Sequence, residues 1–85
     1  MKLTIYKFHA VARCPVRDQL DVYEAVAKSE EMIECEHIAT AVIRFSTDKL
    51  FQEELTSRLA EVLRCEVTLT GTHSGVQVVS TGYGS

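Results

Sequence analysis

The stretch Cys14-Pro15-Val16-Arg17-Asp18-Gln19-Leu20-Asp21 carries a thiol and, seven residues later, a carboxylate, and it separates two runs of alternating apolar residues. In the first run, Leu3–Ala12, β-branched and aromatic residues favour a strand. Pro15 has no backbone N–H to donate to a ladder, so the strand ends before it. The second run, Leu20–Ala27, follows a polar turn and predicts a second strand. We therefore expect a hairpin with Cys14 and Asp21 across its mouth.

The second strand has two distinct faces. Because successive side chains of a strand point to opposite sides, Asp21 shares its face with Tyr23 and Ala25. The opposite face takes Leu20, Val22 and Glu24.

Two helices are predicted after this hairpin. The first is indicated by apolar residues at helical spacing, namely Ile38, Ala41, Val42 and Phe45. The second is indicated by a longer apolar stripe, made of Leu50 or Phe51, Leu55, Leu59, Val62 and Leu63. Ser46–Asp48 lies between them and offers capping residues for the second helix. Glu54 and Arg58 are spaced as a helical ion pair on the solvent side.

The C-terminal part of the sequence predicts a second hairpin. Apolar and polar residues alternate from Cys65 to Thr70, and Val76–Ser80 returns as a fourth strand. Gly71–Gly75, which includes His73, is predicted to be the turn between them. Gly82–Ser85 is predicted to be a frayed tail.

This order of elements predicts an α+β fold. Two strands, two helices and two strands form one antiparallel four-stranded sheet with both helices on one face, in a single domain over residues 1–85. An 85-residue chain has a small core, and such a sheet leaves its outer edges exposed. We therefore expect a homo-oligomer in which sheets pair and close into a barrel.

Composition favours some classes of partner over others, and tRNA stays possible but is not favoured. The formal net charge is −3 and no basic run is present, so binding of a tRNA substrate would need a basic patch built by assembly. No apolar stretch is long enough to span a bilayer, and the start of the chain has no signal-peptide pattern. The expected location is the cytoplasm, with no membrane partner.

Several motifs in this order resemble one known family. Cys14–Asp21 keeps the cysteine, proline, glutamine and aspartate of a C-P-V-T-G-Q-P-D-like segment. Ile33–Ala39 falls on a V-E-S-K-S-L-K segment at a helix start, Phe51–Glu53 on an F-H-E segment, and Thr72–Val76 on a short R-G-G-like turn. These segments are typical of the 7-cyano-7-deazaguanine nitrile reductases (the QueF family). This family shares the tunnelling fold with GTP cyclohydrolases and pyruvoyl-tetrahydropterin synthases, and the resemblance spans Phe8 to Val79.

The resemblance implies a covalent mechanism in queuosine-type tRNA modification. Cys14 would add to the nitrile carbon of a 7-deazapurine to form a thioimide. The expected partner is therefore a small 7-deazapurine or a pterin-like ligand. Asp21 would donate the proton, since a nitrile needs a thiolate and a nearby acid. Glu53 would hold the base through a bidentate, charge-assisted contact. Glu34 falls on the family's leading glutamate and Gln52 on its histidine, so both are expected to bind substrate.

The sequence does not decide which cofactor is used or how the second half of the reaction proceeds. The family's reductases use NADPH, whose phosphates bind the lysines of E-S-K-S-x-K, and this chain has Glu36 and Ala39 at those positions. A related branch, the archaeosine-type amidinotransferases, keeps the cysteine and aspartate, lacks that motif and uses ammonia. The third alternative is a non-catalytic tunnelling-fold module that binds a base or has a structural role.

The remaining cysteines and histidines suggest no further chemistry. Three cysteines at unrelated spacings, in a chain without a secretion signal, do not indicate a disulfide framework. Cys35 and Cys65 are expected to be packing residues. The side chains His9, Cys14, Cys35, His37 and His73 match no tetrahedral zinc signature, so no metal is expected.

Overall fold

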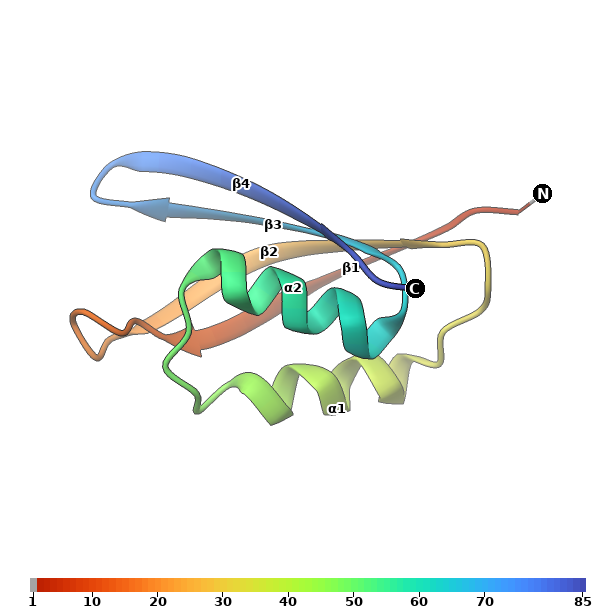
Figure 1. The fold of residues 1–85 in the computed structure, drawn as a ribbon, viewed down its shortest axis with the longest axis horizontal. Helices are drawn as coiled ribbons and strands as arrows, with labels where there is room; N and C mark the ends of the chain where they lie inside the picture. Colours follow the sequence, from red (N-terminus) through yellow and green to blue (C-terminus); the bar gives the residue numbers. More distant parts are fainter. Residues whose placement is uncertain (1) are drawn as a thin grey trace.

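The six secondary-structure elements occur in the order predicted from the sequence. The computed structural model describes residues 2–85, with β1 (Thr4–Arg13), β2 (Leu20–Ser29), α1 (Cys35–Phe45), α2 (Gln52–Leu63), β3 (Glu66–His73) and β4 (Val76–Tyr83). The strands form one antiparallel sheet in the order β1-β2-β3-β4. Both helices lie on one face of this sheet (Figure 1). The predicted α+β architecture is confirmed.

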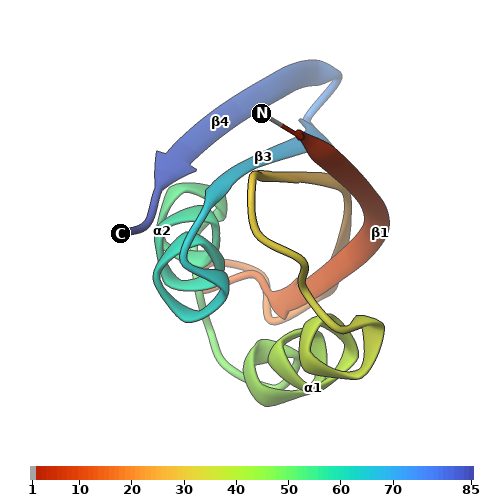
Figure 2. The ribbon, with the colours of Figure 1, turned by 90° about the vertical axis from the view of Figure 1, so that its right-hand side faces the viewer.

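The sheet curls around the two helices, as the end-on view in Figure 2 shows. α2 packs against β3 and β4, whereas α1 packs against β1 and α2. On the helix-facing side of the first hairpin, large and small residues sit opposite each other. Phe8 pairs with Ala25, and Ala10 pairs with Tyr23. The small partner leaves room for the large one, so the helices can approach the sheet closely.

The two predicted faces of β2 are confirmed. Tyr23 and Ala25 are buried, whereas Leu20, Val22 and Glu24 are exposed. The outer face of the sheet carries no helix within residues 2–85 and exposes apolar side chains such as Ile5, Val22 and Val79. Closure into a barrel by self-association stays a prediction. None of the helices within residues 2–85 is long and apolar enough to cross a membrane.

The second hairpin is tighter than predicted. Gly71–Gly75 is not a five-residue turn, because β3 continues to His73, which pairs with Val76. The turn consists of Ser74 and Gly75, whose φ angles are +51° and +81°. Two consecutive positive φ angles match the twist of a two-residue hairpin, and this geometry lets the strands stay paired to their ends. His73 is therefore a strand residue on the helix-facing side.

The C-terminal tail is not frayed, contrary to the prediction from its glycines. β4 continues to Tyr83, and the Gly84 N–H donates to the Cys65 carbonyl at 3.0 Å. A Cβ atom added at Gly84 would overlap the carbonyl oxygen of Ala60. The glycine is thus needed for close approach of β4 to the end of α2.

The start of α2 is capped from within the helix. Ser46–Asp48 was predicted to provide the cap, but α2 begins later, at Gln52. Glu54 Oε1 accepts a hydrogen bond from the Phe51 N–H at 3.1 Å, which satisfies a free donor at the helix start. Glu54 forms no ion pair with Arg58 in the part of the chain that the structure describes, so that prediction was wrong.

Candidate functional site

A pocket of about 380 Å³ opens where both hairpin turns meet the start of α2. Cys14 and Asp21 both line it, as the sequence predicted for the hairpin mouth. Its volume lies in the range of small-molecule sites. The other lining residues are Pro15, Val16, Arg17, Gln19, Tyr23, Leu50, Phe51, Gln52, Thr72, His73 and Ser74.

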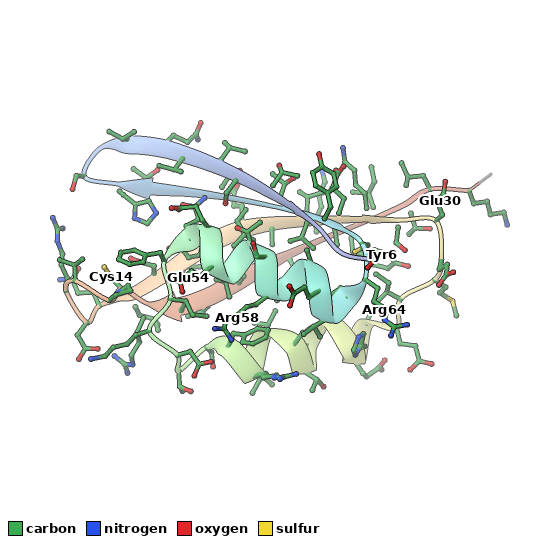
Figure 3. The ribbon with its side chains drawn as sticks, in the orientation of Figure 1. Tyr6, Cys14, Glu30, Glu54, Arg58 and Arg64 are labelled. Carbon is green, nitrogen blue, oxygen red and sulfur yellow. The ribbon has the colours of Figure 1, made fainter. Side chains whose placement is uncertain are left out.

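Backbone hydrogen bonds position Cys14 at this pocket. Its N–H donates to the Gln19 carbonyl at 2.8 Å, and its carbonyl accepts from the Asp18 N–H at 2.9 Å. Asp18 has φ +54°, a left-handed conformation that aspartate adopts more readily than most residues. The Leu50 N–H also donates to the Arg13 carbonyl at 3.1 Å, which ties the end of β1 to the segment before α2. Figure 3 shows Cys14 beside the first turn of α2.

Asp21 lies on the helix-facing side of β2, at the end of the sheet. It pairs with Ala12 of β1 and is half-buried. Its Oδ2 accepts a hydrogen bond from the Tyr23 hydroxyl at 3.4 Å. The Asp21 carboxylate thus lines the pocket, and one of its oxygens is bound by the buried Tyr23 hydroxyl.

Gln52 lines the pocket, but its side chain is bound within the protein. It is 3% exposed, and its Nε2 donates to the Val78 carbonyl at 2.9 Å and to the Leu69 carbonyl at 3.0 Å. Ser80 Oγ lies 3.2 Å from the same nitrogen. Because both amide hydrogens are engaged, the side chain joins α2 to β3 and β4 rather than offering a donor to a ligand.

The Gln52 amide determines that Nε2 of His73 carries a hydrogen. The two carbonyl acceptors require that Nε2 of Gln52 faces them, so Oε1 faces the histidine, 2.8 Å from its Nε2. An amide oxygen can only accept, so His73 Nε2 carries a hydrogen. The histidine ring also packs against Tyr23, with 5.7 Å between ring centroids. Gln52 therefore orients His73 at the pocket wall.

Replacing Gln52 by glutamate is expected to lower the free energy of unfolding by about 3 kcal/mol. A carboxylate would face the Leu69 and Val78 carbonyls, which would repel it, and both hydrogen bonds from the Gln52 amide would be lost. The matched control is Glu53→Gln at the adjacent, exposed position, where a change of less than about 0.5 kcal/mol is expected. Urea unfolding of the three proteins measures the difference, and equal midpoints would contradict the structural role of Gln52.

The two predicted glutamates do not line this pocket. Glu53 is exposed on the first turn of α2, next to the pocket, and lies in a surface hollow with Ser57 and Arg58. Its charge still reaches the pocket, because it helps to raise the pKa of Tyr23. Glu34 precedes α1, which starts at the opposite end of the molecule from Cys14 (Figures 1 and 3).

The other two cysteines have different surroundings from Cys14. Cys65 is buried, and this burial, together with the neighbouring Glu66, raises the pKa of its thiol and makes it a poor nucleophile. Cys35 is exposed at the start of α1, in a groove between β1 and α1. Within residues 2–85, no group of three or more His, Cys, Asp or Glu side chains is arranged to hold a metal ion.

Tyr23 and His73 are pocket residues to which the sequence interpretation gave no role. The alternation of β2 already placed Tyr23 on the face of Asp21, so a signal for it was present. His73 was assigned to a turn because two glycines flank its segment. Arg17 and Ser74, from the two hairpin turns, meet at the pocket mouth with 3.4 Å between Nη2 and Oγ.

The fold and this pocket can be compared with known proteins. The arrangement is that of the tunnelling fold. A solved structure with this fold, the archaeosine synthase QueF-Like in the apo form, superposes with a TM-score of 0.87 over 95% of this chain and 91% of that chain, at 20% sequence identity. No family model and no curated protein matches the sequence. The predicted tunnelling fold is therefore confirmed.

Proposed function

We propose that this protein processes a 7-deazapurine nitrile, such as 7-cyano-7-deazaguanine, through a covalent thioimide on Cys14. The observation that carries the proposal is the presence of Cys14 and Asp21 in the lining of one pocket of about 380 Å³. Two findings support it. Cys14–Asp21 resembles the nitrile-reductase segment, and the fold is shared with a protein described as an archaeosine synthase.

The first half-reaction needs only residues of this pocket. The Cys14 sulfur forms a bond to the nitrile carbon, one π bond of the nitrile breaks, and Asp21 supplies a proton to the nitrogen. The thiol proton leaves to solvent or returns to Asp21. The whole ligand is added and no group departs. Phe51, half exposed at the pocket, offers an aromatic face for the flat ring of the ligand. Glu53, to which the resemblance assigns the base, is exposed on the adjacent first turn of α2.

The residues at the start of α1 do not fit the phosphates of NADPH. The resemblance places the phosphate-binding lysines at Glu36 and Ala39, and the helix start has Glu34 and Glu36 exposed. Carboxylates repel phosphate groups, so we assign no step to this cofactor.

The absence of the phosphate-binding lysines at positions 36 and 39 favours a second candidate for the complete reaction. In an amidinotransferase of the archaeosine type, ammonia attacks the thioimide carbon and the Cys14 sulfur leaves as thiolate, which gives an amidine. This chemistry needs no nicotinamide, so Glu36 and Ala39 do not oppose it. Reduction to an amine, which the nitrile-reductase resemblance implies, requires a hydride donor.

Intact-protein mass spectrometry with 7-cyano-7-deazaguanine tests the proposal. We expect the native protein to gain the full mass of the ligand. Ammonium ions should then release an amidine if the second candidate holds, whereas NADPH should release an amine if reduction occurs. Absence of an adduct at saturating ligand would discard both enzymatic alternatives and leave a binding or structural module.

A further inference from the structure

Tyr23 is an almost completely buried tyrosine whose hydroxyl contacts the pocket carboxylate. The residue is 1% exposed, and its hydroxyl donates to Asp21 Oδ2 at 3.4 Å. Within residues 2–85 this is the one hydrogen bond that the hydroxyl forms. A buried hydroxyl without a hydrogen-bond partner costs free energy, so the Tyr23 hydroxyl depends on Asp21 for its bond. In turn, the same bond holds Oδ2 of Asp21 in place.

The neighbouring strands leave space for this side chain. Ala10 lies opposite Tyr23 on β1. On the other side, a Cβ atom added at Gly71 would overlap the Tyr23 ring, coming within 2.6 Å of Cε1. The tilted His73 ring packs against it from β3. The ring is thus held in place on three sides, with its hydroxyl at the pocket.

The charges around Tyr23 favour its neutral, hydrogen-donating form. Burial raises its pKa well above the usual value, and the negative charges of Asp21, Cys14 and Glu53 raise it further. Arg17 and His73 line the same pocket. Glu24 and His9 lie on the opposite face of the sheet, because their positions alternate with those of Tyr23 and Ala10. Tyr23 is therefore a donor at every pH at which the reaction would run.

We propose that Tyr23 is a positioning residue that holds Oδ2 of Asp21 and directs Oδ1 to the ligand. The inference rests on the proposed function, in which Asp21 gives a proton to the nitrile nitrogen. An acid whose conjugate base accepts a hydrogen bond gives up its proton more readily. The hydroxyl thus favours proton transfer at the moment when the sulfur–carbon bond forms.

The test compares Tyr23→Phe with the native protein in the rate of adduct formation across pH. Removal of the hydroxyl should slow adduct formation about tenfold at the optimum, which corresponds to the loss of one weak hydrogen bond to a charged group, and should change the shape of the pH profile. Reversible binding of a ligand without the nitrile should change less than about twofold, because Tyr23 acts through Asp21.

Tyr6→Phe is the matched control. The Tyr6 hydroxyl accepts from the Ile33 N–H at 2.9 Å, and Figure 3 shows Tyr6 at the far end of the molecule from Cys14. The same chemical change there should lower the thermal midpoint and leave the pH profile of adduct formation unmoved. An equal shift in both variants would overturn the proposal in favour of a general effect on stability.

Two further outcomes separate this inference from the proposed function. An adduct on Tyr23→Phe with the native rate and pH profile would reject the role of Tyr23 alone. Absence of an adduct on the native protein would reject the proposed function, and carbon NMR of the Asp21 carboxyl then decides the inference. We expect its chemical shift at neutral pH to change in Tyr23→Phe and to stay the same in Tyr6→Phe, and an unchanged signal in Tyr23→Phe would refute the coupling.

Discussion

Alanine in place of Cys14 is expected to abolish covalent capture of 7-cyano-7-deazaguanine. The sulfur is the nucleophile of the proposed reaction, and no other thiol lines the pocket. Since Cys14 is half-buried and its loop is held by backbone bonds to Gln19 and Asp18, we expect the fold to persist. Intact mass should show unmodified protein at every time, while calorimetry should still detect reversible binding.

Cys35→Ala provides the control for this experiment. Cys35 is exposed and would be the first thiol to react in a non-specific way. We expect Cys35→Ala to form the adduct at the native rate. Persistence of the adduct in Cys14→Ala and its loss in Cys35→Ala would place the chemistry in the groove between β1 and α1 instead.

Alanine in place of Gly71 is expected to lower the free energy of unfolding by about 3 kcal/mol. Gly71 is buried on β3, near the turn into β4, and the added methyl would overlap the ring of Tyr23. The ring lies opposite Ala10 on β1 and packs against His73, so a shift away from position 71 would disturb these contacts. Urea unfolding measures the loss, and the pocket should be altered because Tyr23 lines it.

Two other glycines and one double variant test the cause of this loss. A Cβ at Gly82 would lie 3.3 Å from the Thr56 carbonyl, so alanine there should cost less than at Gly71. A Cβ at Gly75 would meet nothing within 4 Å, and alanine there should cost about 1–2 kcal/mol because φ is +81°. In a Tyr23→Val background the added methyl at position 71 should cost much less than in the native protein. An equal cost in both backgrounds would show that the ring is not the obstacle.

The fold could be predicted from the sequence to the level of its elements. Periodicity of two or of about 3.6 assigned each strand and helix, and alternation placed Asp21 and Tyr23 on one face of β2. Element ends were less predictable, because they depend on the partner strand. His73 remains in β3 only because it pairs with Val76, and Gly84 is ordered only because it meets Cys65 and Ala60.

The candidate site could be predicted only in part. The spacing of Cys14 and Asp21 indicated a common pocket, and the structure brings both residues to it. The role of Gln52 could not be predicted, since a polar residue at a helix start is expected to be exposed. Its burial follows from carbonyls of β3 and β4 that are distant in sequence.

Both ends of the described chain, residues 2–85, lie far from the pocket. The register pairs Thr4 with Ser29, Lys28 with Glu66 and Glu66 with Tyr83, so β1 starts and β4 ends at the same end of the sheet. Figure 1 shows this end opposite the hairpin turns that form the pocket mouth. A peptide tag or a surface tether at either terminus would therefore present the pocket to solution, and immobilised protein can be used for ligand screening in a uniform orientation.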